Sequence, residues 1–322
     1  MKINYKIIFF VALLLLYLSF ANNYIGSNGD DSVYVVLGQS LATGNGYRII
    51  SSPENYVNKE YPPLFPLIIA GVFLFWRSLF ILKVFIAIFG VICIYFLYRF
   101  LKLFFREKKA FLISVLTGIS PLFVLYTHQI MSEVIYFLFS ILALYCFMLY
   151  LNQKELSKKY LFLCSIFILL SYFTRTIGFV LILTMFLFIF FERLNKKNLR
   201  KFLFIILIIT LPILFWSVRI LGNEGEIYEQ YSYKDLFFKN NNYDFNSGSL
   251  DLNKVVDRVL YNGEKQITQF SKTIFHPINW ISLFYPSLSW LEIFFILIVF
   301  FIILFGFILS ISKDRTIIEY YF

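Results

Sequence analysis

The segment VIYFLFSILALYCFMLYL, residues 134–151, decides the fold class, because it is an uncharged apolar run long enough to cross a lipid bilayer. Only 15% of the residues in the whole chain are charged, against about 25% in soluble domains. Other apolar segments of spanning length occupy residues 7–25, 79–98, 110–127, 202–221 and 291–311. The sequence therefore predicts an all-α polytopic membrane protein.

Two further apolar stretches contain interruptions. The run at 160–191 is broken by TRTIG at 174–178, which predicts two short spans that meet near one face of the membrane. The segment PPLFPLIIAGVFLFW, residues 62–76, has three prolines and is short for a span. We expect 62–76 to be re-entrant or interfacial.

The distribution of positive charge predicts the topology. If the N-terminus is cytoplasmic and 62–76 does not cross, the predicted cytoplasmic segments hold 17 Lys and Arg against 5 acidic residues. The remainder of the chain holds 12 and 14. The positive-inside rule thus favours eight spans with both termini in the cytoplasm. Residues 1–21, which end in SFA, also fit a signal peptide, and its removal would leave the external loops in place.

A short external helix is predicted after the first span. Apolar residues recur at three- and four-residue spacings, which indicates an amphipathic helix over 31–43 on the outer membrane surface. Asp30 or Asp31 suits its N-cap, and Gly44 or Gly46 suits its end. Capping would account for one of the two aspartates.

The predicted topology gathers ionisable residues on the external face. They come from separate segments of the chain and include Asp30, Asp31, Glu133, Arg175 and Arg219. Ionisable groups at membrane depth are costly and are functional candidates. A carboxylate can take the proton of an acceptor hydroxyl, and a cation can hold a phosphate leaving group. This combination suits group transfer from a lipid-linked donor.

The order of the external motifs resembles that of GT-C glycosyltransferases, in particular the branch of protein O-mannosyltransferases and lipid A aminoarabinose transferase. The motifs are DDSVY at 30–34, KEYPPLFPLIIA at 59–70, SEVIY at 132–136, SYFTRTIGFVLIL at 171–183 and LPILFWSVR at 211–219. The resemblance implies a GT-C-like bundle of about eight transmembrane helices with external juxtamembrane helices. It also implies a polyprenyl-phosphate sugar donor and an active site on the external face.

The resemblance implies roles for individual residues. Asp30 matches the family's catalytic aspartate and general base. Glu133 matches an acidic residue of the second external loop and is predicted to be catalytic together with Asp30. The residues expected to bind substrate are Asp31, Lys59, Tyr61, Arg175 and Arg219. Glu60 separates Lys59 from the Tyr-Pro-Pro motif, which departs from the family pattern and weakens the case for Lys59 as a phosphate ligand.

Three parts are predicted along the chain. Residues 1–221 form the transmembrane catalytic module, with the first external loop at 26–78. Residues 222–290 form an external segment with an amphipathic helix at 251–261, and 291–322 hold the last span and a short cytoplasmic tail. Members of the resembled family usually continue with more spans, so the chain is expected to be either a short or a truncated member.

The expected partners are a polyprenyl-phosphate-linked sugar donor, an acceptor glycan, lipid or protein, and the lipid bilayer of the plasma (inner) membrane. Nucleic acid is not expected, because the positive charges are segregated by loop. No motif specifies a cofactor or a metal site, and a divalent metal is left open. The alternative functions are a transporter or flippase, which would also hold ions within a helical bundle, and an inactive truncated GT-C-like protein.

Overall fold

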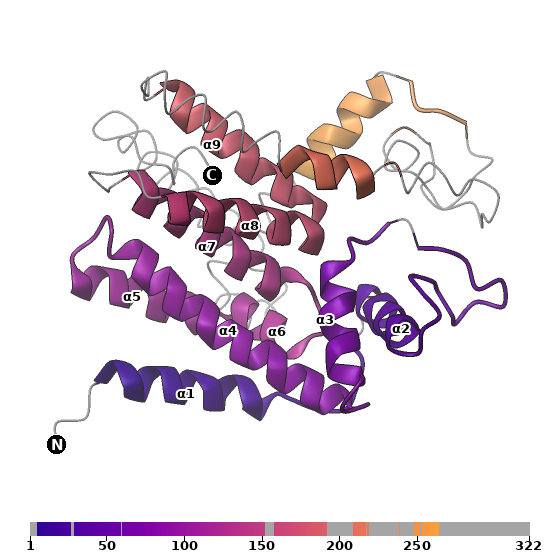
Figure 1. Cartoon of the computed structure of the whole chain (residues 1–322), viewed down its shortest axis with the longest axis horizontal. Coiled ribbons are helices and arrows are strands. Elements are labelled where there is room, and N and C mark those ends of the chain that lie inside the picture. The colour runs from indigo at the N-terminus through magenta and orange to yellow at the C-terminus, as the bar shows by residue number, and fades with distance from the viewer. Residues whose placement is uncertain are drawn as a thin grey trace, which may run out of the picture. The chain divides into compact units, whose positions relative to one another are not determined.

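A computed structural model describes residues 5–26, 29–58, 60–151 and 158–191, together with shorter stretches between 209 and 263. Within these residues the extended elements of regular structure are helices, and Arg48 and Val57 form an isolated bridge in the loop after α2. Figure 1 shows the helices α1 (Tyr5–Ser19), α2 (Asp30–Ala42), α3 (Leu64–Phe73), α4 (Leu79–Leu101), α5 (Glu107–Gly118), α6 (Pro121–His128), α7 (Glu133–Leu151), α8 (Lys158–Thr174) and α9 (Phe179–Phe191). A 3-10 turn, η1 (Thr176–Gly178), separates α8 from α9.

The long apolar helices confirm a multi-pass membrane protein. Among the described residues, α4 and α7 are each long and apolar enough to cross a membrane, and the bent pair α5 and α6 makes a third candidate. The helices α1, α8 and α9 are shorter and apolar, and the break predicted at 174–178 lies between α8 and α9. The predicted last span at 291–311 lies outside the described residues.

The segment of spanning length at 110–127 is bent and divided between α5 and α6. The chain bends by 57° between α5 and α6. Pro121 is the first residue of α6, and Ser120 before it has an extended backbone with ψ 135°. Proline disfavours the helical conformation in the preceding residue, and the Ser120 hydroxyl accepts a hydrogen bond from the Phe123 amide to start the new helix. These two effects bend the segment.

The two short helices between α1 and α4 agree with the sequence pattern. The helix expected at 31–43 is α2, which is followed by Gly44 at φ 79°, in the left-handed region that glycine tolerates. The proline-rich segment 62–76 forms only the ten-residue helix α3, too short for a perpendicular span.

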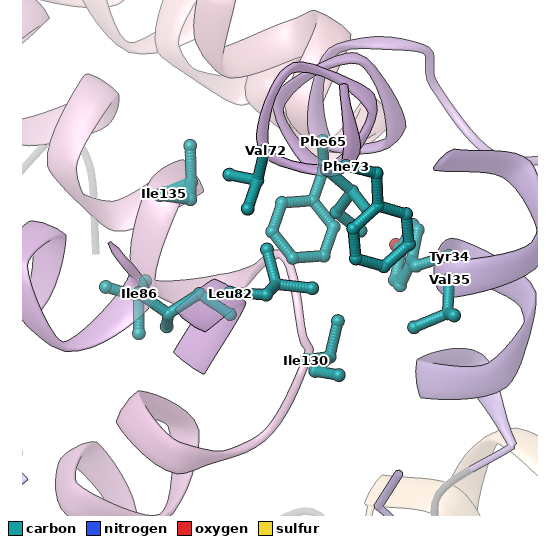
Figure 2. Close-up of a cluster of buried hydrophobic side chains, with 11 residues drawn as sticks. Tyr34, Val35, Phe65, Val72, Phe73, Leu82, Ile86, Ile130 and Ile135 are labelled. Carbon is teal, nitrogen blue, oxygen red and sulfur yellow. The ribbon is translucent and has the colours of Figure 1, made fainter. Parts of the chain in front are cut away.

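The helices α2 and α3 pack closely against each other (Figure 1). A Cβ atom at Gly38 of α2 would lie 2.3 Å from Ile69 Cγ2 of α3, so glycine allows this approach. A buried apolar cluster extends from this contact to α4 and to the start of α7, and Figure 2 shows Tyr34, Phe65, Leu82 and Ile130 within it. The cluster fixes α2 to the membrane helices.

By compactness the chain divides into Met1–Glu226, together with the last three residues, and Ile227–Glu319. All the described site residues belong to the first unit. In the second unit residues 253–263 are helical, in agreement with the helix predicted at 251–261, and Val256, Val259 and Leu260 on this helix are exposed. The three-part division of the chain stays a prediction.

Candidate active site

The first acidic residue, Asp30, is held by the tyrosine of the Tyr-Pro-Pro motif. Asp30 begins α2, and the Tyr61 hydroxyl donates a hydrogen bond of 2.7 Å to its Oδ1. Tyr61 is itself fixed, because its amide donates to Asn58 Oδ1 and its carbonyl accepts from the Tyr47 hydroxyl. Burial and the bond to Asp30 raise the pKa of Tyr61. The phenol therefore stays protonated and serves as a donor to the carboxylate.

The second acidic residue, Glu133, is paired with an arginine. Glu133 is the first residue of α7, and its Oε1 contacts Nη1 of Arg175, which lies between α8 and η1. The side chain of Arg175 is 37% exposed and that of Glu133 is 22% exposed. The other carboxylate oxygen, Glu133 Oε2, is buried without a hydrogen-bond partner among the described residues. The break in the run 160–191 thus places a cation beside the carboxylate.

Tyr34 and Ser132 connect these two pairs. The Tyr34 hydroxyl and Ser132 Oγ are 3.1 Å apart, and Arg175 Nη1 donates to Ser132 Oγ at 3.4 Å. The ring of Tyr34 packs edge-on against the ring of Tyr61, with centroids 4.9 Å apart. Burial raises the pKa of Tyr34 to about 12. Asp30 is close enough to Arg175 for their charges to interact.

Tyr34 and Ser132 were not among the predicted site residues, although the sequence contains a signal for each. Tyr34 lies four residues after Asp30, which places both on one face of a helix. Ser132 directly precedes Glu133 in the SEVIY motif.

Asp31 does not join this group. Its side chain is fully buried, and neither carboxylate oxygen has a hydrogen-bond partner among the described residues. Burial raises the pKa of Asp31, while the nearby backbone of Ile130 and Gly26 and the charge of Lys83 act in the opposite direction. Asp31 was expected to contact the substrate, but its carboxylate has no access to solvent and is not placed for such a contact.

The prediction that an aspartate side chain caps α2 is wrong. The N-cap is Gly29, and no side chain makes a capping hydrogen bond there. Both aspartates instead lie in the first turn, where negative charge interacts favourably with the helix dipole. Their carboxylates turn to different neighbours, Tyr61 for Asp30 and the linker after α1 for Asp31.

A lysine near the end of a membrane helix is expected to extend its side chain outward to the surface, but Lys83, in the first turn of α4 (Leu79–Leu101), does not. Lys83 is 3% exposed, and its Nζ donates hydrogen bonds of 2.6 Å to Asn22 Oδ1 and to the Tyr24 carbonyl. The linker after α1 covers the lysine, which explains its burial.

Two predicted cations, Lys59 and Arg219, lie outside the described residues. Trp216, three residues before Arg219, packs edge-on against Tyr47 and Phe173, with ring centroids 5.8 and 6.4 Å apart. These contacts bring the end of the helical stretch 209–216 to the loop between α2 and α3 and to the end of α8. Across the described residues, no three His, Cys, Asp or Glu side chains group as a metal site would need.

The arrangement is suited to proton transfer beside a bound anion. Asp30 is half-buried, and its Oδ2 accepts no hydrogen bond within the described part of the chain. A carboxylate oriented through one oxygen can accept a proton with the other. Arg175 is engaged through Nη1, and its planar fork of N–H groups suits bidentate binding of a phosphate.

The resemblance to GT-C proteins that was inferred from the sequence is confirmed by a family match and by similarity to a GT-C-like fold. Residues 60–216 match the family described as Dolichyl-phosphate-mannose-protein mannosyltransferase. This match begins after the acidic pair and ends at Trp216. No curated protein sequence matches the chain.

The structure is similar to two crystal structures of ArnT from Cupriavidus metallidurans. The apo structure shares 15% identity with this chain at a TM-score of 0.54, over 71% of this chain and 45% of ArnT. The structure bound to undecaprenyl phosphate gives the same identity and TM-score, over 70% of this chain and 43% of ArnT. This chain therefore spans less than half the length of the solved structures that it matches.

Proposed function

We propose that the protein is a membrane glycosyltransferase that moves a sugar from a polyprenyl-phosphate donor to an acceptor hydroxyl on the outer face of the membrane. The observation that carries the proposal is the arrangement of two polar groups side by side. Asp30 is hydrogen-bonded to Tyr61, Glu133 and Ser132 contact Arg175, and Tyr34 links the two groups by a hydrogen bond to Ser132 and a ring contact with Tyr61. The family match supports the reaction class. The similarity to the fold of ArnT, which binds undecaprenyl phosphate, supports a donor of that kind.

Asp30 is the general base in this proposal. Its carboxylate takes the proton of the acceptor hydroxyl as the hydroxyl oxygen attacks the anomeric carbon of the donor sugar. The bond from the anomeric carbon to the phosphate oxygen breaks, and the electron pair leaves with the polyprenyl phosphate. Tyr61 fixes Oδ1 of Asp30, so that Oδ2 is the oxygen directed to the acceptor.

Arg175 holds the phosphate of the donor in this proposal. Glu133 and Ser132 orient its guanidinium through Nη1, which leaves the rest of the fork for an anion. The positive charge stabilises the phosphate as a leaving group. Lys59 and Arg219 are proposed to add contacts to the same anion, in line with their place in the resembled motifs.

The test compares Asp30→Asn with the parent protein in proteoliposomes supplied with radiolabelled undecaprenyl-phosphate-linked hexoses and pentoses. Membrane vesicles provide the acceptors. Asn keeps the size of the side chain and an acceptor oxygen for Tyr61, but it has no basicity. We expect the transfer rate to fall by about 100-fold or more, as for the loss of a general base. Equal rates in Asp30→Asn and the parent would refute the assignment of the base.

The matched control is Glu54→Gln, which also removes one negative charge from the first external loop. Glu54 is exposed and hydrogen-bonds only to Ser52 within the described residues, so its loss should leave the transfer rate unchanged. Movement of the labelled lipid across the bilayer without sugar transfer would instead favour the flippase alternative.

A further inference from the structure

We propose that the connection between α4 and α5 binds the headgroups of anionic phospholipids and anchors this end of the helical bundle at the membrane surface. The binding surface, here called the basic turn, consists of five exposed cations: Arg99, Lys102, Arg106, Lys108 and Lys109. The proposal does not depend on the proposed function, because the basic turn is not part of the candidate active site.

The basic turn lies where the chain leaves and re-enters the bilayer. The preceding helix, α4, has 23 residues, and a helix of that length is about 34 Å long, enough to cross the hydrocarbon core. The following helix, α5, is the first half of the bent pair that makes the third candidate span. The side chains of the basic turn are therefore at the level of the lipid headgroups.

The candidate active site is at the opposite end of α4. Leu82 and Ile86, near the start of α4, belong to the apolar cluster that also holds α2 and the start of α7. The basic turn follows the last residue of the same helix. About one bilayer thickness therefore separates the basic turn from Arg175, so the donor phosphate proposed at Arg175 is not the anion that the basic turn would bind.

The one acidic residue within 99–109, Glu107, is already paired with a cation from another helix. Lys6 of α1 contacts Glu107 Oε1 through its Nζ. The same Nζ donates a hydrogen bond of 2.9 Å to the Tyr98 hydroxyl, which donates one of 3.1 Å to Glu107 Oε1. Glu107 is thus compensated by Lys6, and the positive charges of the basic turn keep no acidic partner among the described residues.

The cations themselves are free to bind an anion. The side chains of Arg106, Lys108 and Lys109 form no hydrogen bond or ion pair with the described part of the chain. Lys102 lies over the ring of Tyr98, with its Nζ 5.6 Å from the centroid, and this neutral partner leaves the charge uncompensated. Clusters of Lys and Arg directly beside a membrane span attract anionic lipids.

An exposed aromatic side chain favours a lipid over a soluble anion. Phe105 lies within the basic turn and is 41% exposed. A phenylalanine in water loses the free energy that burial in the interfacial region of a bilayer would provide. A soluble phosphate would compensate the charges but leave this ring in water. A bilayer that contains anionic lipids satisfies both the cations and the ring.

The test measures contact between Phe105→Trp and lipids that carry a nitroxide quencher close to the headgroup. The four native tryptophans are replaced by phenylalanine, and the protein is placed in phosphatidylcholine vesicles with a minor fraction of labelled phosphatidylglycerol or labelled phosphatidylcholine. We expect phosphatidylglycerol to quench the fluorescence with roughly ten-fold higher apparent affinity. Equal quenching by the two lipids would overturn the proposal.

The variant Lys108→Gln/Lys109→Gln should lower this preference by roughly five-fold or more, because each cation near an anionic surface contributes to binding. The matched control is Arg77→Gln/Lys254→Gln, which removes two exposed positive charges elsewhere and should leave the preference unchanged. An unchanged preference in Lys108→Gln/Lys109→Gln, or an equal fall in the control, would overturn the proposal.

Two further measurements exclude other anion sites. Arg175→Gln should keep the preference for phosphatidylglycerol, and its loss in this variant would place the bound lipid at the candidate active site and overturn the proposal. Inorganic phosphate should not compete with the labelled lipid at an ionic strength matched with chloride, and competition would show a site for soluble phosphate instead. Sugar transfer is not measured, so failure of the proposed function would leave this test decisive.

Discussion

Replacing Tyr61 with Phe removes one hydroxyl group and leaves most of the site in place. The hydroxyl donates the 2.7 Å hydrogen bond to Asp30 Oδ1, while the ring packs against Tyr34. A hydrogen bond to a charged group contributes about 1.5–3 kcal/mol. If the bond is needed in the transition state, its loss should lower kcat by roughly 10- to 100-fold. The ring contact is kept in Phe, so the thermal unfolding temperature should change little.

The assay measures initial rates over a range of donor concentrations, so that kcat and KM are separated. Tyr24→Phe is the control, because it removes a hydroxyl from a side chain that is 76% exposed in the linker after α1. In the double variant Asp30→Asn/Tyr61→Phe, the second substitution should add little, since Tyr61 acts through Asp30. A kcat of Tyr61→Phe within about two-fold of the parent value would show that the orienting role is incorrect.

Three further variants address the phosphate contact and the packing of the site. Arg175→Gln should weaken binding of undecaprenyl phosphate by at least roughly ten-fold through the loss of charge-assisted hydrogen bonds. Unchanged affinity in a direct binding assay would show that Arg175 does not bind the phosphate and has only a structural role. Gly178→Ala should destabilise the break by about 1–3 kcal/mol, seen as a lower unfolding temperature in detergent, because a Cβ there would lie 2.6 Å from the backbone nitrogen of Tyr172. Gly38→Ala should cost a similar amount, since its Cβ would lie 2.3 Å from Ile69, and a parent-like unfolding temperature would show that α2 and α3 can separate.

The sequence was sufficient to predict α2 and α3 and to name most residues of the candidate site. The three- and four-residue spacing of apolar residues and the glycines that follow predicted the position of α2. The prolines of 62–76 indicated that α3 would be short. The expected topology placed Asp30, Tyr61, Glu133 and Arg175 on one side of the membrane, and the structure brings them together as two hydrogen-bonded groups linked by the ring contact of Tyr34 with Tyr61. These residues could be grouped from the sequence because the expected side of the membrane depends on charge counts and span lengths, both of which are local properties.

Other features depend on contacts between distant residues. The burial of Lys83 requires Asn22 and Tyr24, about sixty positions earlier in the chain. The rule that lysine extends to the membrane surface considers only the position of the residue in its own helix, so it does not predict such contacts. The direction of Asp31 likewise depends on Gly26 and α4. The bend before Pro121 did have a local signal, but the apolar composition on both sides conceals it in a hydropathy window.

The separation in sequence of the partners Glu133 and Arg175 has a consequence for the order in which the protein is made. Glu133 leaves the ribosome forty-two residues before Arg175, and the whole of α7 and α8 lies between them. During membrane insertion Glu133 therefore has no counter-charge until α8 and Arg175 have been synthesised. An unpaired carboxyl group in that position is costly in free energy unless it is hydrated or protonated. A chain interrupted before Arg175 would keep Asp30 and Tyr61 but would leave Glu133 unpaired, so such an intermediate should be a substrate for membrane quality control.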